Sequence, residues 1–138
     1  MATSDFSASI GAAAATLIVV DPLRATRLLV TVSPDSVFSC VWRGKSNERN
    51  PPEILKPWFE KLLGAVSEKK GSIEMHFEKI EHFNSSTITA LIKLIQVCRK
   101  SNVKLVMVYD QSLKWQRLSF DALRVFEKND DLFHLRFA

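Results

Sequence analysis

The fold is decided by residues 72–109, which read SIEMHFEKIEHFNSSTITALIKLIQVCRKSNVKLVMVY. In residues 72–78 apolar and polar side chains alternate, which predicts a half-buried strand. Residues 87–100 carry polar side chains at steps of four, three and four. Only one narrow stripe of that helix would then meet water, and the rest would pack on a sheet. Residues 104–109 are apolar without alternation, as in a central strand buried on both faces. The stretch therefore predicts a strand–helix–strand unit with a right-handed crossover.

The segments on either side extend this unit into an α/β domain. Residues 28–32 and 37–43 are rich in β-branched and aliphatic side chains, and the Pro- and Asp-containing turn between them predicts a hairpin. Residues 53–69 repeat apolar side chains at three- and four-residue steps, which predicts an amphipathic helix. Residues 113–128 predict a third helix, and residues 132–137 alternate as a last strand. The predicted order is β-β-α-β-α-β-α-β, which is an α/β fold.

The length and composition of the chain indicate one globular domain. A chain of 138 residues is long enough for a single core. We expect residues 25–138 to form the domain and residues 1–24 to be a loosely ordered N-terminal segment or an extra strand. The net charge is +4, and the Lys and Arg residues are scattered along the chain. Because nucleic-acid binding normally needs a denser basic stripe, we do not expect nucleic acid as a partner.

The cysteines and the apolar run near the start predict a cytoplasmic protein. Cys40 and Cys98 lie in apolar surroundings without CxxC or His-rich spacing, which predicts core thiols in a reducing compartment and no metal site. Residues 10–20 form an apolar run that is too short to span a bilayer. It also lacks the positively charged flank of a secretory signal. We expect no membrane insertion, and a monomer or weak dimer.

The sequence contains none of the common catalytic motifs. GxGxxG, GxxxxGK[ST] and GxSxG do not occur. His76, His82 and His134 occur singly, on different predicted elements. His82 could approach Ser85, but a serine–histidine pair also needs a third group and an oxyanion site. We therefore expect a non-enzymatic protein, with no catalytic residue, no metal and no cofactor.

The loop before the second helix carries the most informative polar cluster, Asn84-Ser85-Ser86-Thr87. Asn and Ser at this place are helix-capping residues, because their oxygens accept the unpaired amides of the first turn. In one interpretation, Ser85 or Ser86 is only a cap. In the other, a phosphoryl group binds there, because it would face free amides and the positive end of the helix dipole. Such a group would add negative charge at an exposed corner and could disrupt the docking of a partner.

These residues resemble two families of regulatory proteins. The order of elements and the serine pair opening the helix after the third predicted strand resemble the STAS domains of bacterial anti-sigma factor antagonists, over roughly residues 25 to 137. Those domains carry Asp-Ser-Ser-Gly or a near variant, so Asn84 stands at the Asp, Ser85 at the phosphorylated Ser and Thr87 at the Gly. A second resemblance is to the SiaC-like biofilm-regulating phosphoproteins. It rests on the Asn before the hydroxyl residue, on Gly44-Lys45-Ser46 with the following Glu and Pro residues, and on Pro57-Trp58-Phe59.

The resemblance implies a STAS-like fold, with a mixed sheet and helices mainly on one face. It also implies a signalling switch in which Ser85, or alternatively Ser86, is reversibly phosphorylated. The expected partners are an anti-sigma-type serine kinase or a related regulator, and a phosphatase. The SiaC-like resemblance implies instead a module that activates a nucleotide (diguanylate) cyclase, and a constitutive scaffold is the third alternative. The residues expected to bind the partner are Asn84, Ser85, Ser86, Thr87, Thr89 and Lys93.

Overall fold

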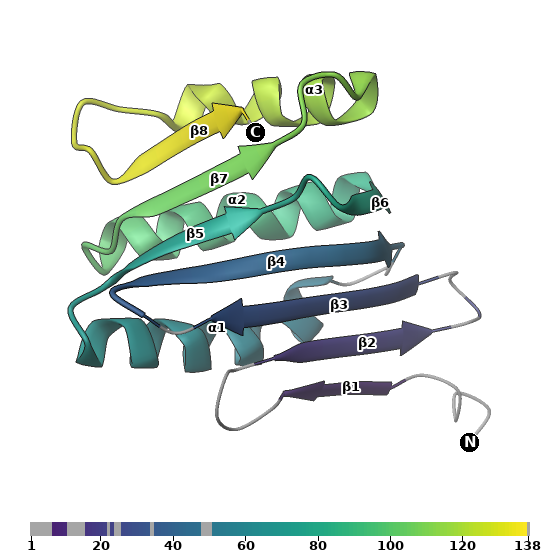
Figure 1. Ribbon diagram of the computed structural model, residues 1–138, viewed down its shortest axis with the longest axis horizontal. Coiled ribbons are helices and arrows are strands. Elements are labelled where there is room, and N and C mark those ends of the chain that lie inside the picture. The colour runs from purple at the N-terminus through teal and green to yellow at the C-terminus, as the bar shows by residue number, and fades with distance from the viewer. Residues whose placement is uncertain are drawn as a thin grey trace.

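The computed structural model describes residues 7–10, 16–21, 23, 26–33, 35–47 and 51–137. One sheet and three α-helices make up this part of the chain (Figure 1). The strands are β1 (Ser7–Ile10), β2 (Leu17–Asp21), β3 (Thr26–Ser33), β4 (Val37–Ser46), β5 (Ser72–His76), β6 (Ile80–Phe83), β7 (Leu105–Tyr109) and β8 (Phe133–Phe137). The helices are α1 (Pro51–Glu68), α2 (Ser85–Lys100), α3 (Lys114–Asp121) and the 3-10 helix η2 (Ala122–Phe126).

The sheet is mixed, and its strand order is β1-β2-β3-β4-β5-β7-β8. Strands β1 to β4 are antiparallel neighbours, whereas β4, β5, β7 and β8 run parallel. β5 pairs with the first half of β4 and β6 with its end, so β6 continues the line of β5 along β4. The parallel neighbours need crossovers, which the helices supply.

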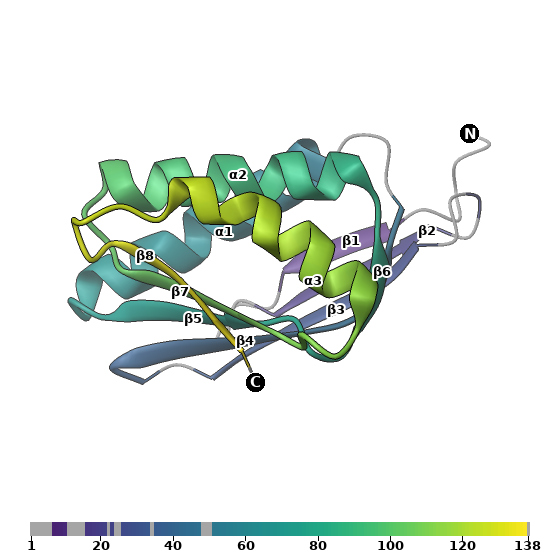
Figure 2. The same ribbon diagram turned by 90° about the horizontal axis from the view of Figure 1, so that it is seen from above.

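All three α-helices lie on one face of the sheet, and no described helix covers the other face (Figure 2). The predicted α/β class, with a mixed sheet and helices mainly on one face, is therefore confirmed. The expectation of a buried central strand at residues 104–109 holds for most of β7, in which Leu105, Met107, Val108 and Tyr109 are buried. Val106 is only half-buried on that strand.

The structure has three strands beyond the predicted order. β6 lies where a loop was predicted, and β1 and β2 lie within residues 1–24, of which residues 1–6, 11–15, 22 and 24 are outside the described part. The hairpin predicted from residues 28–32 and 37–43 is formed by β3 and β4. The predicted third helix is split, because α3 ends at Asp121 and continues as η2.

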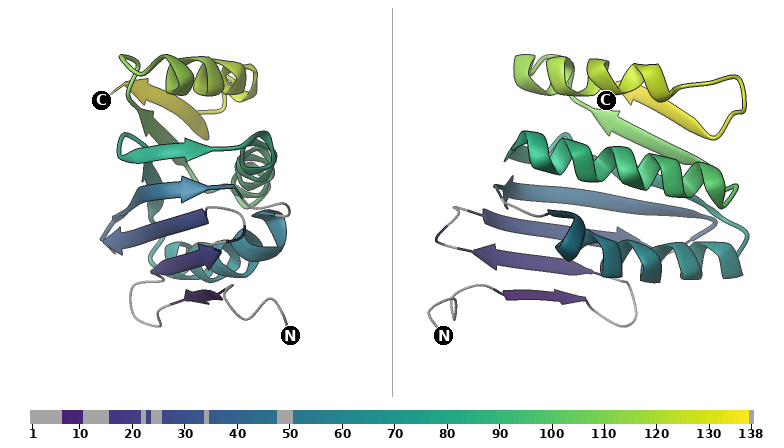
Figure 3. Two further views of the ribbon diagram at one scale, coloured as in Figure 1. Left: turned by 90° about the vertical axis from the view of Figure 1, so that its right-hand side faces the viewer. Right: turned by 180° about the vertical axis from the view of Figure 1, so that it is seen from behind.

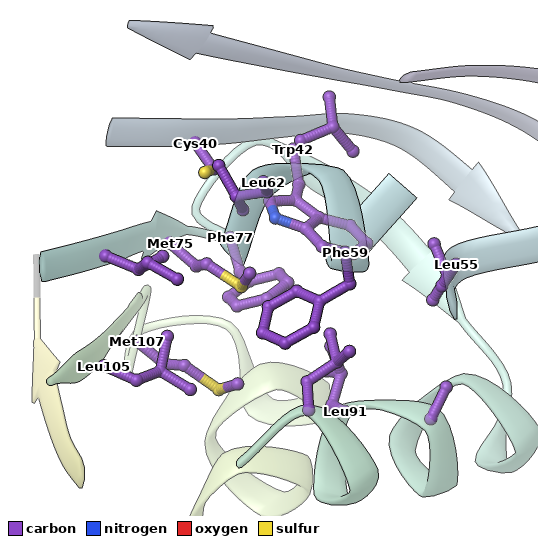
Figure 4. Packing of buried hydrophobic residues seen from close by; sticks show 14 of the residues in the cluster. Cys40, Trp42, Leu55, Phe59, Leu62, Met75, Phe77, Leu91, Leu105 and Met107 are labelled. Atoms are coloured by element: carbon purple, nitrogen blue, oxygen red, sulfur yellow. The ribbon is translucent and has the colours of Figure 1, made fainter. Parts of the chain in front are cut away.

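The core lies between the sheet and the helices (Figure 4). Its centre is aromatic: Trp42 of β4 packs edge-on against Trp58 of α1, with ring centroids 5.7 Å apart, and lies 4.9 Å from Phe77. Aromatic contacts of this geometry add to the free energy gained by burying the rings. The aromatic core thus fixes α1 against β4, and the end of β4 leads into the polar residues described next.

Candidate functional site

Two polar segments that are far apart in the sequence meet where β4 ends and α2 begins. The hydroxyl oxygens of Ser46 and Thr87 lie 3.0 Å apart, and both residues are buried. The backbone amide of Asn84 donates to the carbonyl of Ser46 at 3.1 Å. The Thr87 hydroxyl donates to Oδ1 of Asn84 at 2.9 Å. Because that hydroxyl has one proton, Ser46 is the donor in the Ser46–Thr87 bond. This network fixes the start of α2 to the sheet.

Asn84 is the N-cap of α2. Its backbone is extended (φ −83°, ψ 176°), and its side-chain oxygen accepts a hydrogen bond from the Thr87 amide at 3.0 Å. The helix therefore begins at Ser85, two residues earlier than predicted. The interpretation of Ser85 or Ser86 as the cap is wrong, because the Asn84 oxygen already occupies the position that accepts the first-turn amide.

The predicted partner-binding residues divide by exposure. Ser85, Thr89 and Lys93 are exposed along one stripe of α2, and Ser86 and Asn84 are half-buried. The Thr89 hydroxyl donates to the Ser85 carbonyl at 3.2 Å. Thr87 is 0% exposed, so the expectation that it contacts a partner is wrong, and its role is structural. We call Asn84, Ser85 and Ser86 the α2 corner.

The Ser85 hydroxyl makes no hydrogen bond within the described residues, and only its backbone carbonyl is engaged. Ser85 and Ser86 occupy the first two positions of α2, where no intrahelical carbonyl is available to the amides. The first turn of α2 contains no acidic residue. An anionic group on Ser85 would therefore meet the positive end of the helix dipole without a neighbouring carboxylate in that turn.

Aromatic side chains support the α2 corner from the side of α3. Phe83 packs edge-on against Trp115 and Phe120, at centroid distances of 5.1 Å and 5.8 Å. His82 lies against Trp115, with centroids 6.1 Å apart. No hydrogen bond joins His82 to Ser85 in the described part of the chain, so the structure does not assemble the serine–histidine pair considered from the sequence.

A groove of about 490 Å³ runs between α1 and α2, and Lys93 is one of its lining residues. The two helices lie side by side when the molecule is seen from behind (Figure 3). The groove has a mostly apolar floor and three lysines against one acid, and its lining residues are Leu55, Lys56, Phe59, Glu60, Ala90, Lys93, Leu94, Gln96, Val97 and Lys100. We call it the α1–α2 groove. The sequence predicted Lys93 as a partner-binding residue, but it did not show that α1 forms the wall of the groove opposite α2.

A solved structure shares this fold. It is the crystal structure of the diguanylate cyclase SiaD in complex with its activator SiaC from Pseudomonas aeruginosa. One of its chains aligns with a TM-score of 0.54 and 16% sequence identity, over 83% of this chain and 94% of that chain. No protein-family model and no curated protein matches the sequence. At this identity the likeness establishes a common fold.

The other ionisable groups in the described part of the chain include two buried thiols and no cluster of metal-ligating side chains. The described residues contain no group of three or more His, Cys, Asp or Glu side chains that could hold a metal ion. Burial raises the pKa of both the Cys40 and Cys98 thiols to about 12, so both are protonated at neutral pH. None of the described helices combines the length and apolar content needed to cross a membrane.

Proposed function

We propose that this chain is a non-enzymatic regulatory protein that binds a protein partner through the α2 corner and the adjoining stripe of Thr89 and Lys93. In this proposal, phosphorylation of Ser85 by a serine kinase releases the partner, and a phosphatase restores binding. The observation that carries the proposal is the Ser85 hydroxyl, which is exposed at the first position of α2 while Asn84 serves as the cap. The resemblance of the corner to that of anti-sigma factor antagonists supports a kinase of the anti-sigma type.

Asn84 caps α2, whereas the Ser85 hydroxyl takes no part in the cap. This difference supports a switch that leaves the fold intact. Asn84 and Thr87 make the hydrogen bonds that hold the helix start. Modifying the Ser85 hydroxyl removes none of these bonds. A phosphoryl group carries about −1.5 to −2 charges at neutral pH and is favoured near free helix amides. The domain can therefore exist in both states with the same architecture.

The charges of the α1–α2 groove support an acidic, amphipathic segment of the partner as the occupant. The groove presents Lys56, Lys93 and Lys100 around its apolar floor, against the single acid Glu60. Apolar side chains of the partner would bury against Phe59 and Val97, while its carboxylates would face the lysines. A phosphate on Ser85 would then repel the acidic segment, which explains release.

A second candidate is that the partner is a nucleotide cyclase, which this protein activates by binding. The supporting observation is the shared fold with a chain of a complex between a diguanylate cyclase and its activator. Both candidates use the same binding surface of this protein, so they differ only in which partner binds to it. Affinity purification of the tagged chain from its native host distinguishes them, because recovery of a cyclase favours the second candidate and recovery of a kinase alone favours the first.

Phosphosite mapping tests the switch itself. We expect the intact protein from cells to include a species heavier by about 80 Da, one phosphoryl group, which phosphatase treatment removes. Ser85→Ala should abolish this species, and the neighbouring substitution Ser86→Ala should preserve it. Loss of the species in Ser86→Ala, with retention in Ser85→Ala, would move the modification to Ser86. Absence of the species in all growth conditions, with partner binding retained, would leave a constitutive scaffold instead.

A further inference from the structure

The uncovered face of the sheet contains a basic hollow at the end of β3 and β4. This hollow, of about 520 Å³, is lined by Val20, Thr26, Arg27, Leu29, Arg43, Gly44, Lys45 and Glu81. Figure 2 shows that the helices lie on the opposite side of the sheet. The basic hollow is therefore separate from the α1–α2 groove. It contains three cations against one carboxylate.

Two of these cations are placed where they repel each other. Arg27 and Lys45 are direct partners in the antiparallel ladder of β3 and β4. Like charges directly opposite each other destabilise such a ladder. Arg43 pairs with Leu29, two residues further along the same face, so a third positive charge lies beside the first two. None of the three forms an ion pair with any residue in the described part. Three positive charges therefore lie on neighbouring positions of β3 and β4 without an ion-pair partner among the described residues.

Gly44 lies between Arg43 and Lys45 at a close approach of the β3 and β4 backbones. Gly44 has a φ of +96°, and a Cβ atom there would lie 1.8 Å from the carbonyl oxygen of Arg27. Only glycine allows β3 and β4 to approach this closely in that conformation. The pairing of β4 with β6 also shifts register between Gly44 and Lys45. The backbones of β3 and β4 therefore lie close together at Arg27 and Gly44, directly beside the Arg27–Lys45 pair.

We propose that the basic hollow binds a small organic phosphate that carries two or more negative charges. Arginine guanidinium groups match phosphate oxygens with paired hydrogen bonds, and Lys45 adds a third donor. Val20 and Leu29 supply apolar surface for the organic part. The volume lies in the range of small-molecule sites, about 300–1,000 Å³. Bound phosphate would also relieve the repulsion between Arg27 and Lys45, which explains why the fold keeps it.

Titration of the ¹⁵N-labelled protein with ADP and with inorganic pyrophosphate tests the proposal. We expect saturable shifts of the Arg27, Arg43, Gly44 and Lys45 amides with both probes, and tighter binding of ADP because of its apolar part. Binding to vesicles that contain phosphatidylserine is measured as a third comparison. Binding to the vesicles without binding to the soluble probes would overturn the proposal, as would shifts that do not saturate.

The substitution Lys45→Glu separates ligand binding from a purely structural role of Lys45. It should raise the stability of the protein and weaken ADP binding at the same time. It converts the cross-strand repulsion into an ion pair, so we expect the melting temperature to rise by about 1–4 °C. The same substitution should weaken ADP binding by about tenfold or more, because one charge-assisted contact becomes repulsive. The control is Lys61→Glu on the exposed side of α1, with the same charge change and no effect on ADP binding. Equal ADP binding by both variants, or a destabilised Lys45→Glu, would contradict the proposal.

Discussion

Ser46 and Thr87 share a buried hydrogen bond of 3.0 Å that joins the end of β4 to the first turn of α2. They are 41 positions apart in the sequence. Through this bond, and through the Asn84 amide on the Ser46 carbonyl, the sheet determines where α2 begins. The exposed Ser85 hydroxyl is therefore held at a fixed place by hydrogen bonds that its own side chain does not make.

The first prediction concerns this bond. Thr87→Val keeps the shape of the side chain but leaves the buried Ser46 hydroxyl without its acceptor, and the Asn84 side-chain oxygen keeps only the bond from the Thr87 amide. We expect the free energy of unfolding to fall by about 1–3 kcal/mol, the cost of unsatisfied buried polar groups. Thr89→Val is the matched control, since Thr89 is exposed on the same helix, and should change stability by less than about 0.5 kcal/mol. Urea unfolding of both variants measures the difference. Equal stability of the two variants would contradict the assigned role of Thr87.

The second prediction concerns the approach of β3 and β4. Gly44→Ala should destabilise the protein by about 1–3 kcal/mol or more, because its Cβ would overlap the Arg27 carbonyl at a positive φ. Gly64→Ala is the opposite case: no atom lies within 4 Å of its added Cβ, and the residue is inside α1. We expect it to stabilise the protein by about 0.5–1 kcal/mol. Thermal unfolding of the two variants measures both stability changes. A Gly44→Ala variant more stable than the unmodified protein would refute the close approach of residue 44 to the Arg27 carbonyl.

The third prediction concerns the charge of the α1–α2 groove. Lys93→Glu should slow association with the acidic partner by about tenfold at low salt, and by less at high salt, because exposed charges are screened. Lys61→Glu is the control, because Lys61 lies on α1 outside the groove lining. Surface plasmon resonance at two salt concentrations measures both. An equal loss in the two variants would show that only net charge matters, and would remove the groove from the proposed interface.

The fourth prediction concerns the thiols. Cys40 and Cys98 are buried, and burial raises the pKa of each thiol to about 12. The folded state therefore favours the protonated thiols more than the unfolded state does. This contribution to stability is complete below about pH 9 and is lost as the pH rises toward 12. At pH 8 we expect iodoacetamide to modify neither thiol in the native protein and both after denaturation, as mass spectrometry would show. Rapid native modification would indicate that the thiols are accessible.

The sequence predicted what depends on local pattern and missed what depends on distant partners. The amphipathic periodicity of α1 and α2 and the hairpin of β3 and β4 are local, and all were predicted. The position of β6 was missed because Glu81 and His82 are exposed in a short strand whose partner, the end of β4, lies more than thirty residues earlier.

The candidate site shows the same limit. Asn84, Ser85 and Ser86 are all good capping residues, so only the backbone geometry identifies Asn84 as the cap. Thr87 was predicted to bind the partner, because its buried hydrogen-bond partner Ser46 belongs to another segment of the sequence. The opposite wall of the α1–α2 groove likewise depends on how the helices pack.

Partner affinity as a function of charge at Ser85 tests the central claim most directly. Binding of the partner recovered from the native host should be measured by calorimetry for the unmodified protein, Ser85→Ala, Ser85→Asp and Ser86→Asp. We predict that Ser85→Ala binds as the unmodified protein does, and that Ser85→Asp binds at least about tenfold more weakly with an unchanged melting temperature. Ser86→Asp, on a half-buried neighbour, should weaken binding less. Equal binding by Ser85→Ala and Ser85→Asp would contradict the account.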